Sequence, residues 1–288
     1  HLPLGYGKND NGEWLANISA PPTTKSFLRP TYCWRFVRSL MASYKLLQEI
    51  NPDVVNYHFY RRSALFFALW KNVFDFKLII SCHGGGDVDN IRGFLRTASP
   101  FIFRQADTVT CVSEQLADKL REEDVGCNDP QTVHNGVDYN WWSTEKRKCS
   151  NKIVTVGNLK KAKGHDTLIE AFAIVHDKYP SYELVIVGDG PKKGEYTNLT
   201  EKLGVADSLR ITGWLPREEV RTILEEATIF VFPSRFEGFG LALLEAMSMG
   251  VPVVTSDVGG IPEVIGGAQA LKVNPDDAPS LAKAMDKA

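Results

Sequence analysis

Two glutamates, Glu237 and Glu245, flank the start of a helix-like segment in the second half of the chain. Residues 238–241 (Gly-Phe-Gly-Leu) follow an apolar run and open a stretch with helical periodicity. Glycine permits a tight loop whose backbone lies close to a ligand, and a helix start presents unpaired N–H groups and a positive dipole. The pattern predicts an anion site suited to a diphosphate. An ordinary strand–loop–helix turn is the simpler alternative, and the two acids favour a functional site.

The two glutamates are too far apart to act as the acid and base of a hydrolase. On one helix, eight residues at 1.5 Å per residue separate them by about 12 Å, whereas the carboxylates of an inverting glycosidase lie at most ~9.5 Å apart. Each is therefore interpreted as a separate binder of hydroxyl groups. Glu245 is expected in the second turn, leaning back towards the helix start, where a carboxylate suits a ribose diol. A glutamate on a solvated helix face is the alternative.

A second glycine-containing turn, residues 157–164, carries Lys163 after the first strand predicted in this half. A lysine in such a turn suits phosphate oxygens, although a solvated basic turn is equally consistent. The Walker pattern G-x-x-x-x-G-K-[ST] is absent. A third turn, residues 188–190 (Gly-Asp-Gly), does not complete G-x-G-x-x-G because Lys193 replaces the last glycine. An NAD site is therefore rejected.

His83 precedes a run of three glycines that ends on Asp87 in the first half. A histidine and an aspartate on such a loop can contact a polar substrate, and a flexible turn with a satisfied histidine is the alternative. Asp87 and Asp89 also spell D-x-D, a hypothetical divalent-metal pair, but two acids at this spacing are common by chance. The other histidines lack ligand spacing, and no G-x-S-x-G triad is present. No metal site is predicted.

The second half alternates short apolar runs with helical periodicity. Strands are predicted at 153–156, 184–187, 209–212, 228–232 and 251–255, and helices at 167–178, 195–203, 218–226, 241–249 and 279–288. Because the runs are too apolar to expose one face to water, they indicate a parallel sheet covered on both faces. The predicted fold class is therefore α/β and doubly wound.

The first half shows the same alternation less cleanly. Strands are predicted at 54–57, 77–81 and 108–112, and helices at 34–49, 63–72, 91–104 and 114–123. Residues 1–30 are rich in Gly, Pro and Asn and are predicted to be irregular. A polar stretch, 143–151, is interpreted as a linker. Two α/β domains, 1–144 and 145–288, are therefore expected to form a cleft, because such sheets bind ligands at the carboxyl ends of their strands.

Composition excludes several classes of protein. With 288 residues, 43% hydrophobic and 24% charged, the chain can build about two globular domains and is not collagen-like, disordered or a disulfide scaffold. A net charge of −2 argues against a dedicated nucleic-acid binder. The five cysteines are scattered without C-x-x-C, which favours free thiols in a reducing, cytoplasmic compartment. No signal peptide or membrane-spanning run is found, and a start at His1 suggests a trimmed chain.

Together, these motifs resemble glycosyltransferase family 4, retaining sugar transferases of the GT-B fold. In the second domain the resemblance rests on Gly157, Lys163-Gly164, the turn at 187–191, Gly213-Trp214, Pro233-Ser234, Glu237, Glu245, 250–252 (Gly-Val-Pro) and 257–260 (Asp-Val-Gly-Gly). In the first it rests on 53–55 with His58, 83–87, Ala106-Asp107 with Ser113, and 135–138 (Asn-Gly-Val-Asp). The order and spacing of these motifs together are specific to the family, although each motif alone is weak evidence for it.

The resemblance implies two Rossmann-like domains facing a central cleft. The first, 1–144, would be the acceptor-side domain without its opening strand, and the second, 145–288, would bind a nucleotide-diphosphate sugar. The implied reaction moves a hexose-type sugar, with retention, from a UDP- or GDP-sugar to a hydroxyl of a glycan or lipid-linked acceptor, with no metal required. Catalytic roles are implied for Glu237 near the donor sugar, Lys163 on the leaving diphosphate and His83 on the sugar. Donor-binding roles are implied for Glu245 on the ribose and for Gly157, Asn158, Gly188, Gly190, Gly213, Trp214, Gly238, Phe239, Gly240 and Leu241.

One departure from the family pattern leaves alternatives open. Asn158 stands where the family usually has arginine, so one phosphate-binding charge is missing, with Lys160 and Lys161 the nearest other cations. A nucleotide-sugar-binding module with little or no transferase activity is therefore the main alternative. A metal-dependent transferase of the other main fold, using Asp87 and Asp89, is a third hypothesis.

The uneven distribution of basic and acidic residues along the chain suggests a membrane contact as a further hypothesis. Residues 25–104 hold twelve Lys and Arg against five Asp and Glu, a net of +7, whereas residues 151–288 hold fifteen against nineteen, a net of −4. The basic region also contains aromatic residues, namely Trp34, Phe36, Phe66, Phe67, Trp70, Phe101 and Phe103. A basic, aromatic face suits an anionic membrane surface, so peripheral attachment at the cytoplasmic leaflet is considered. Packing of these aromatics in a core is the alternative.

Overall fold

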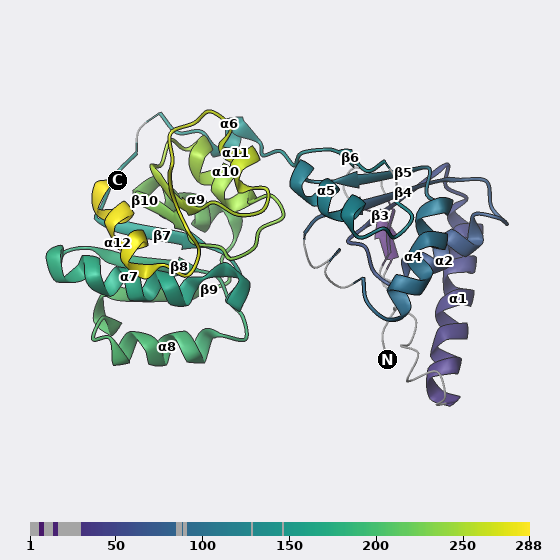
Figure 1. Ribbon diagram of the computed structural model, residues 1–288, viewed down its shortest axis with the longest axis horizontal. Coiled ribbons are helices and arrows are strands. Elements are labelled where there is room, and N and C mark those ends of the chain that lie inside the picture. Colours follow the sequence, from purple (N-terminus) through teal and green to yellow (C-terminus); the bar gives the residue numbers. More distant parts are fainter. Residues whose placement is uncertain are drawn as a thin grey trace. The chain divides into compact units, whose positions relative to one another are not determined.

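The computed structural model describes residues 6–8, 14–16, 30–84, 88, 91–127, 129–145 and 147–288. Contacts between residues divide the chain into two compact units, His1–Val133 and His134–Ala288. Both are drawn in Figure 1, and each is described by itself below.

Unit 1 is built on a four-stranded parallel sheet. The strands, in the order β3-β4-β5-β6, are β3 (Val54–His58), β4 (Lys77–Cys82), β5 (Thr108–Cys111) and β6 (Gln131–Thr132). Its helices are α1 (Pro30–Ile50), α2 (Ala64–Trp70), α4 (Phe94–Gln105) and α5 (Glu114–Glu122). Helix α2 packs against α1 and α4, whereas α5 packs on β5 and β6. Two short strands, β1 (Tyr6–Lys8) and β2 (Trp14–Ala16), form a separate antiparallel pair.

Unit 2 is built on a six-stranded sheet in the order β12-β11-β10-β7-β8-β9, with every neighbouring pair parallel. The strands are β7 (Lys152–Val156), β8 (Glu183–Val187), β9 (Leu209–Gly213), β10 (Ala227–Phe232), β11 (Val253–Ser256) and β12 (Leu271–Val273). The helices are α6 (Tyr139–Trp142), α7 (His165–Lys178), α8 (Lys193–Lys202), α9 (Arg217–Glu226), α10 (Leu241–Ser248), α11 (Ile261–Ile265) and α12 (Ala278–Lys287), with 3-10 turns η2 (Lys161–Lys163) and η3 (Ala206–Ser208).

Helices cover both faces of the unit 2 sheet (Figure 1). Successive side chains of a strand point to opposite faces, and in β7 both are apolar: Ile153 packs in the core beneath α7 and α12, whereas Val154 packs in the core beneath α9 and α10. Both residues are at most 1% exposed. This confirms the predicted doubly wound α/β class, because a strand buried on both faces must carry apolar residues at consecutive positions.

The order of the strands reverses at β7, which lies between β10 and β8. In such sheets the chain leaves neighbouring strands towards opposite faces at this switch point, and a crevice opens beyond the carboxyl ends of the strands. The segments after β7 and β10, residues 157–164 and 233–240, carry Lys163 and Glu237. The topology therefore brings the two predicted catalytic residues of this unit to one place.

The long predicted elements are present, whereas several short ones were missed. The prediction that residues 1–30 are irregular is wrong for β1 and β2, and β6, α6, α11 and β12 were not predicted. These elements have two to five residues, too few to show a hydrophobic period. The stretch predicted as a linker, 143–151, falls within unit 2, where the Lys148 and Ser150 amides donate to the carbonyls at the end of α9, 2.9 Å each.

None of the helices that the structure describes combines the length and the apolar character needed to cross a bilayer. Of the cysteines described, Cys82, Cys111 and Cys127 are buried free thiols and Cys149 is exposed.

Candidate functional site

Lys163 and Glu237 form an ion pair at the switch point of unit 2. Lys163 ends the η2 turn after β7, and its Nζ donates a hydrogen bond to the Glu237 carboxylate. The ammonium also lies 5.3 Å from the centre of the Phe232 ring, at the end of β10. The two side chains are 24% and 14% exposed. The site thus pairs a cation and a carboxylate that are largely shielded from solvent.

The two loops that carry this pair are locked together through their backbones. The Arg235 amide donates to the Ala162 carbonyl at 2.9 Å. Gly164 has a φ of +65°, and a Cβ there would lie 2.0 Å from the Pro233 carbonyl oxygen. A residue with a side chain at 164 would therefore push apart the loops after β7 and β10.

The Arg235 side chain also links the loops after β7 and β10 through hydrogen bonds. Its guanidinium donates to both carboxylate oxygens of Asp166, at 2.8 and 2.9 Å, and also contacts Asp276 and the Lys161 carbonyl. Burial alone would raise the pKa of Asp166, but the hydrogen bonds from Arg235 outweigh it and hold that pKa below its usual value. Sequence reasoning did not single out Arg235, since a lone arginine in a loop gives no signal of its carboxylate partners.

The loop after β11 fixes the backbone of Glu237. The Gly260 amide donates to the Glu237 carbonyl at 3.1 Å. A Cβ at Gly259, whose φ is +58°, would lie 1.9 Å from the same oxygen. The Asp-Val-Gly-Gly motif at 257–260 therefore has a steric reason, which is close approach to the residue predicted to bind the donor sugar.

The predicted glycines that follow β7 and β8 also lie beside Gly213, the last residue of β9. The Gly188 amide donates to the Gly213 carbonyl at 3.0 Å. A Cβ at Gly188 would lie 2.0 Å from the Gly157 carbonyl oxygen, and one at Gly190 would lie 2.7 Å from that of Leu159. The loops after β7 and β8 are thus packed backbone to backbone at the carboxyl edge of the sheet, and this packing leaves no room for a side chain at 188 or 190.

A tryptophan and an asparagine next to these glycines are exposed to solvent. Trp214, which directly follows β9, is 78% exposed, and Asn158 is also exposed. A large aromatic ring left in water beside glycine loops is a surface on which a planar group can stack.

Helix α10 begins beside the ion pair. Gly240 is its N-cap, with a φ of +100°, and a Cβ there would lie 3.5 Å from the Glu237 Cγ. Gly238 and Phe239 are buried, whereas Leu241, the first helical residue, is 42% exposed. The predicted anion-binding helix start therefore directly adjoins Glu237.

Glu245 lies one turn further along α10 and is half-buried. Burial raises the pKa of its carboxyl to about 7, an effect that the charge of Arg217 partly offsets. The Arg217 guanidinium stacks 4.4 Å from the centre of the Trp141 ring. Glu237 lies in the loop before Gly240, the N-cap of α10, so the two glutamates are not on one helix and the helical spacing assumed for them does not apply.

His83 belongs to unit 1, where it follows β4. Its Nε2 lies 2.7 Å from Nδ1 of His58, the last residue of β3. Burial lowers the pKa of His83, and the neighbouring His58 lowers it further. Asp87 and Asp89 lie outside the described residues. Within the part of the chain that the structure describes, no three His, Cys, Asp or Glu side chains gather where they could hold a metal.

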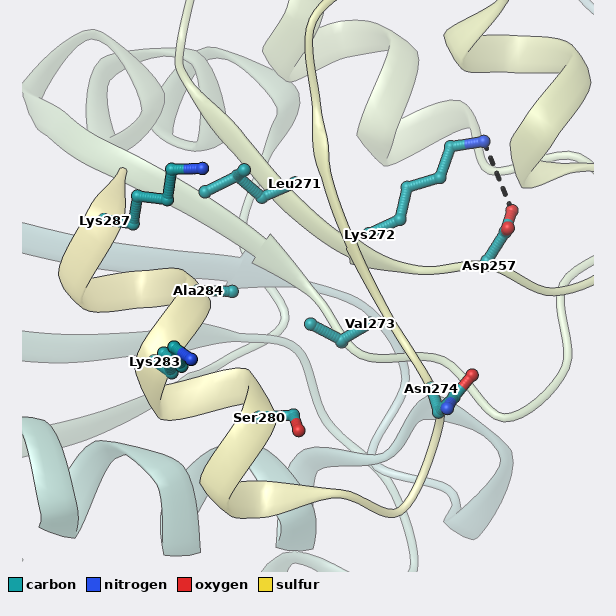
Figure 2. A pocket seen from close by; sticks show the side chains of 9 residues that line it. All are labelled: Asp257, Leu271, Lys272, Val273, Asn274, Ser280, Lys283, Ala284 and Lys287. Atoms are coloured by element: carbon teal, nitrogen blue, oxygen red, sulfur yellow. Dashed lines mark ion pairs between the residues drawn. The ribbon is translucent and has the colours of Figure 1, made fainter.

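A separate pocket of about 420 Å³ lies between β12 and α12 and includes none of the predicted site residues. In Figure 2, Leu271 and Val273 extend from the strand towards the helix, and Lys283 and Lys287 come from α12. Lys272 turns towards Asp257, 3.4 Å away. The pocket belongs to the outer edge of the sheet, away from the switch point.

Two family models cover nearly the whole chain. Residues 140–288 match glycosyl transferases group 1, and residues 5–141 match glycosyltransferase family 4. The two matches meet near α6, close to the boundary between the two units.

Curated relatives carry the names of sugar transferases and synthases. N-acetyl-alpha-D-glucosaminyl L-malate synthase of Bacillus anthracis is 30% identical over 77% of this chain and 61% of its own length. Glycogen synthase of Mycobacterium tuberculosis is 28% identical over 82% and 59%. The GPI3 component of the phosphatidylinositol N-acetylglucosaminyltransferase of Saccharomyces cerevisiae is 32% identical over 51% and 33%. The chain thus spans about 60% of the length of the first two relatives.

Solved structures share the fold. Sucrose-phosphate synthase from Thermosynechococcus elongatus superimposes with a TM-score of 0.77 at 21% identity, over 98% of this chain and 75% of that one. Anabaena HepE, solved with UDP and glucose, superimposes with a TM-score of 0.72 at 18% identity, over 87% and 71%. This likeness removes the alternative of the other main transferase fold. The chain belongs to the group 1, family 4-type glycosyltransferases and has the GT-B fold.

Proposed function

We propose that the protein is a retaining glycosyltransferase that moves a hexose-type sugar from a nucleotide-diphosphate donor to an acceptor hydroxyl. The observation that carries the proposal is the Lys163–Glu237 pair at the switch point of unit 2, beside the start of α10. A diphosphate needs a cation and free N–H groups, and a sugar needs hydroxyl acceptors. The pair and the helix start supply all three.

In the proposed reaction, the bond between the sugar C1 and the diphosphate oxygen breaks while the acceptor oxygen bonds to C1. The electron pair stays on the diphosphate, and the acceptor proton passes to the departing phosphate oxygen. Lys163 and the α10 amides stabilise the charge that develops there, because they are already oriented towards it. Glu237 accepts hydrogen bonds from the sugar hydroxyls, and His83 of unit 1 contacts the same sugar.

The nucleoside is proposed to lie over the glycine loops after β8 and β9, with Trp214 beside the base and Glu245 on the ribose. The exposed ring of Trp214 and the backbone-lined edge at Gly188 and Gly213 support this placement. Uracil is the proposed base, with guanine second, since the structurally similar HepE was solved with UDP and with UDP-glucose. The chemistry assigned to these residues needs no metal.

The acceptor is proposed to be a glycan or a lipid-linked acceptor at the cytoplasmic face of a membrane. Helix α1 supports the membrane contact, because Trp34, Val37 and Met41 are 64%, 45% and 48% exposed at one-turn spacings, and Arg38 is exposed between them. Apolar side chains beside a cation suit an anionic leaflet. Phe66, Phe67 and Phe103 are in the core instead. The proposed membrane contact is therefore assigned to α1 and not to all the aromatic residues of the basic region.

A donor screen tests the proposal. The protein is heated with UDP-, GDP- and ADP-sugars, and one class should raise Tm, because a ligand that binds only the folded state stabilises it. The same donor should then give a glycosylated acceptor by mass spectrometry. Lys163→Met should lower the rate of transfer by about 10²–10³, whereas Lys202→Met, at an exposed lysine of α8, should leave it unchanged. No Tm shift with any donor would reject the proposal, and binding without transfer would support the inactive module.

For the membrane contact, the measurement is sedimentation with liposomes. Trp34→Ser with Met41→Ser should weaken binding to vesicles rich in anionic lipid, whereas Tyr139→Ser, at a residue of unit 2 that is 63% exposed, should not. Binding that does not depend on anionic lipid would contradict the proposed membrane contact.

A further inference from the structure

Arg235 lies in the loop after β10, two residues before Glu237, and its guanidinium is fully engaged within unit 2. A guanidinium has five N–H groups, and this one makes five hydrogen bonds. Nε donates to Asp276, Nη1 donates to the Lys161 carbonyl and to Asp166, and Nη2 donates to Asp166 and to the Thr167 hydroxyl. Because every donor already has an acceptor, none is left for a phosphate oxygen.

The acceptors enclose Lys163 from both sides along the chain. Lys161 begins the η2 turn that ends at Lys163, and Asp166 lies in the first turn of α7, three residues beyond it. The backbone adds to these contacts, because the amides of Arg235 and Phe236 both donate to the Ala162 carbonyl, at 2.9 and 3.3 Å. The whole segment that carries Lys163 is therefore held against the loop that carries Glu237.

The η2 turn has little structure of its own to hold Lys163. Its internal hydrogen bonds run from the Lys163 amide to the Lys160 carbonyl, 3.0 Å, and from the Gly164 amide to the Lys161 carbonyl, 3.2 Å. A single 3-10 turn of three residues is marginal by itself. A lysine ammonium at the end of a flexible stem lies wherever its backbone and its partners place it. The position of the ammonium thus depends on contacts from outside the turn.

The pairing of Arg235 with Asp166 requires the shape of a guanidinium. Its two terminal nitrogens contact both carboxylate oxygens, at 2.8 and 2.9 Å, and the two side chains are mostly shielded from solvent. A planar fork matches a carboxylate in this way, whereas an ammonium is a point charge with three donors. Since the fork is occupied, Arg235 does not supply the phosphate-binding charge that is missing at Asn158.

We propose that Arg235 is a positioning residue that fixes Lys163 relative to Glu237, by holding η2 and the start of α7 against the loop after β10. The inference rests on the proposed function, in which Lys163 stabilises the charge on the departing diphosphate, and it adds the residue that determines where the ammonium lies. A displacement of about 1 Å at a reacting site can lower a rate by about 10²-fold. Arg235 acts through Lys163 and does not touch the donor.

Two substitutions weaken the pair from opposite sides. Arg235→Lys keeps the positive charge but loses the fork. Asp166→Asn keeps the size of the acceptor but removes its charge and one of its two acceptor oxygens. Arg210→Lys is the matched control, at an arginine of β9 whose ion pair with Glu183, 3.3 Å, joins side chains that are 52% and 37% exposed.

The first measurement is hydrogen exchange of the ligand-free protein, followed by mass spectrometry. Arg235→Lys and Asp166→Asn should each speed exchange by at least about tenfold in segments 161–168 and 235–237, because hydrogen bonds to charged groups hold them. Exchange in β8 should stay as in the wild type, and Arg210→Lys should match the wild type throughout. The double variant should add little to either single one, since both remove the same pair.

Two results of this experiment would overturn the inference. One is unchanged exchange in both segments of Arg235→Lys, which would show that other contacts hold the turn. The other is exchange that is faster by the same factor throughout unit 2, which would show that Arg235 stabilises the whole unit and not this place in it.

The second measurement is steady-state transfer with the donor found by the screen, well below the Tm of every variant. Arg235→Lys should lower kcat by about ten- to hundredfold and change KM for the donor by less than about threefold, whereas Arg210→Lys should change neither. Contact between Arg235 and the diphosphate would instead raise KM, and a merely stabilising role would leave kcat unchanged. Either result would overturn the inference. Absence of transfer in the wild type would reject the proposed function instead, and hydrogen exchange would still decide whether Arg235 holds η2.

Discussion

Lys163 and Glu237 lie where neither charge would be stable alone. Their side chains are mostly shielded, and a charge withdrawn from water without a partner is costly. The phenyl ring of Phe232 provides a further favourable surface for the ammonium. The residues proposed for catalysis therefore also maintain the loops after β7 and β10, so their substitution has two effects that an experiment must separate.

Lys163→Met is expected to lower kcat by about 10²–10³, as removal of one preorganised electrostatic group does. It should also lower the free energy of unfolding by about 1–3 kcal/mol, because the Glu237 carboxylate loses a charged hydrogen-bond partner. The double variant Lys163→Met with Glu237→Gln should recover most of the stability but none of the activity. Kinetics and urea unfolding check both parts. Recovery of activity in the double variant would contradict the role of Lys163.

The raised pKa of Glu245 predicts that the stability of the folded protein depends on pH. Burial raises the pKa of its carboxyl from 4.5 to about 7 in the folded protein, so the folded state binds more protons than the unfolded state between these values, and stability falls as pH rises through them. Glu245→Gln removes this effect. Its Tm should exceed that of the wild type at pH 8, and the difference should disappear towards pH 4.5. A difference that is the same at both pH values would contradict the raised pKa.

At the scale of elements, the site is formed by loops held at backbone contact. The order β11-β10-β7-β8-β9 places the five loops after these strands side by side, and Gly164, Gly188, Gly190 and Gly259 are points at which a Cβ would meet the backbone of a neighbouring loop. The glycines thus set the spacing between loops, and the charged residues depend on that spacing.

Gly188→Ala is expected to destabilise unit 2 by about 1–3 kcal/mol, the usual cost of overpacking, because φ is +151° and the new Cβ would lie 2.0 Å from the Gly157 oxygen. Gly194→Ala is the matched control, since it lies within α8 with nothing within 4 Å of a Cβ. It should stabilise by about 0.5–1 kcal/mol through its higher helix propensity. Thermal unfolding compares the two, and a neutral Gly188→Ala would show that the loops can separate.

The sequence allowed prediction of the elements that repeat and of the residues that lie near one another along the chain. The apolar periods of β7, α7, β10 and α10 made the doubly wound fold predictable, and the strand order then brings Lys163 to Glu237. The contacts of Arg235 with Asp166 and Asp276, and of His58 with His83, were not predictable, because their partners lie on separate elements whose side-chain directions depend on the finished packing.

At the scale of the whole molecule, the chain consists of two units, each with a parallel sheet of its own. All predicted donor-binding residues belong to unit 2, and His83 belongs to unit 1. Unit 2 also buries two apolar clusters, one on each face of its sheet. Donor binding and transfer are therefore expected to be separable properties.

A fragment of residues 134–288 should fold cooperatively and bind the donor found by the screen, with an affinity within about tenfold of that of the longer chain, but it should not transfer sugar. Circular dichroism, calorimetry and a transfer assay measure these properties. Transfer by the fragment alone would contradict the role of His83, and failure to bind would show that unit 1 contributes to the donor site.

The place of β7 at the centre of its sheet has a consequence for synthesis on the ribosome. Strand β7 is bonded on one side to β8, which follows it closely, but on the other side to β10, which emerges only after two further strand–helix units. Until then one edge of β7 is unpaired, and open edges invite wrong partners. Non-local parallel pairing is also slow to form. The nascent chain is therefore most exposed to aggregation between the appearance of β7 and that of β10, the interval in which a chaperone would be most useful.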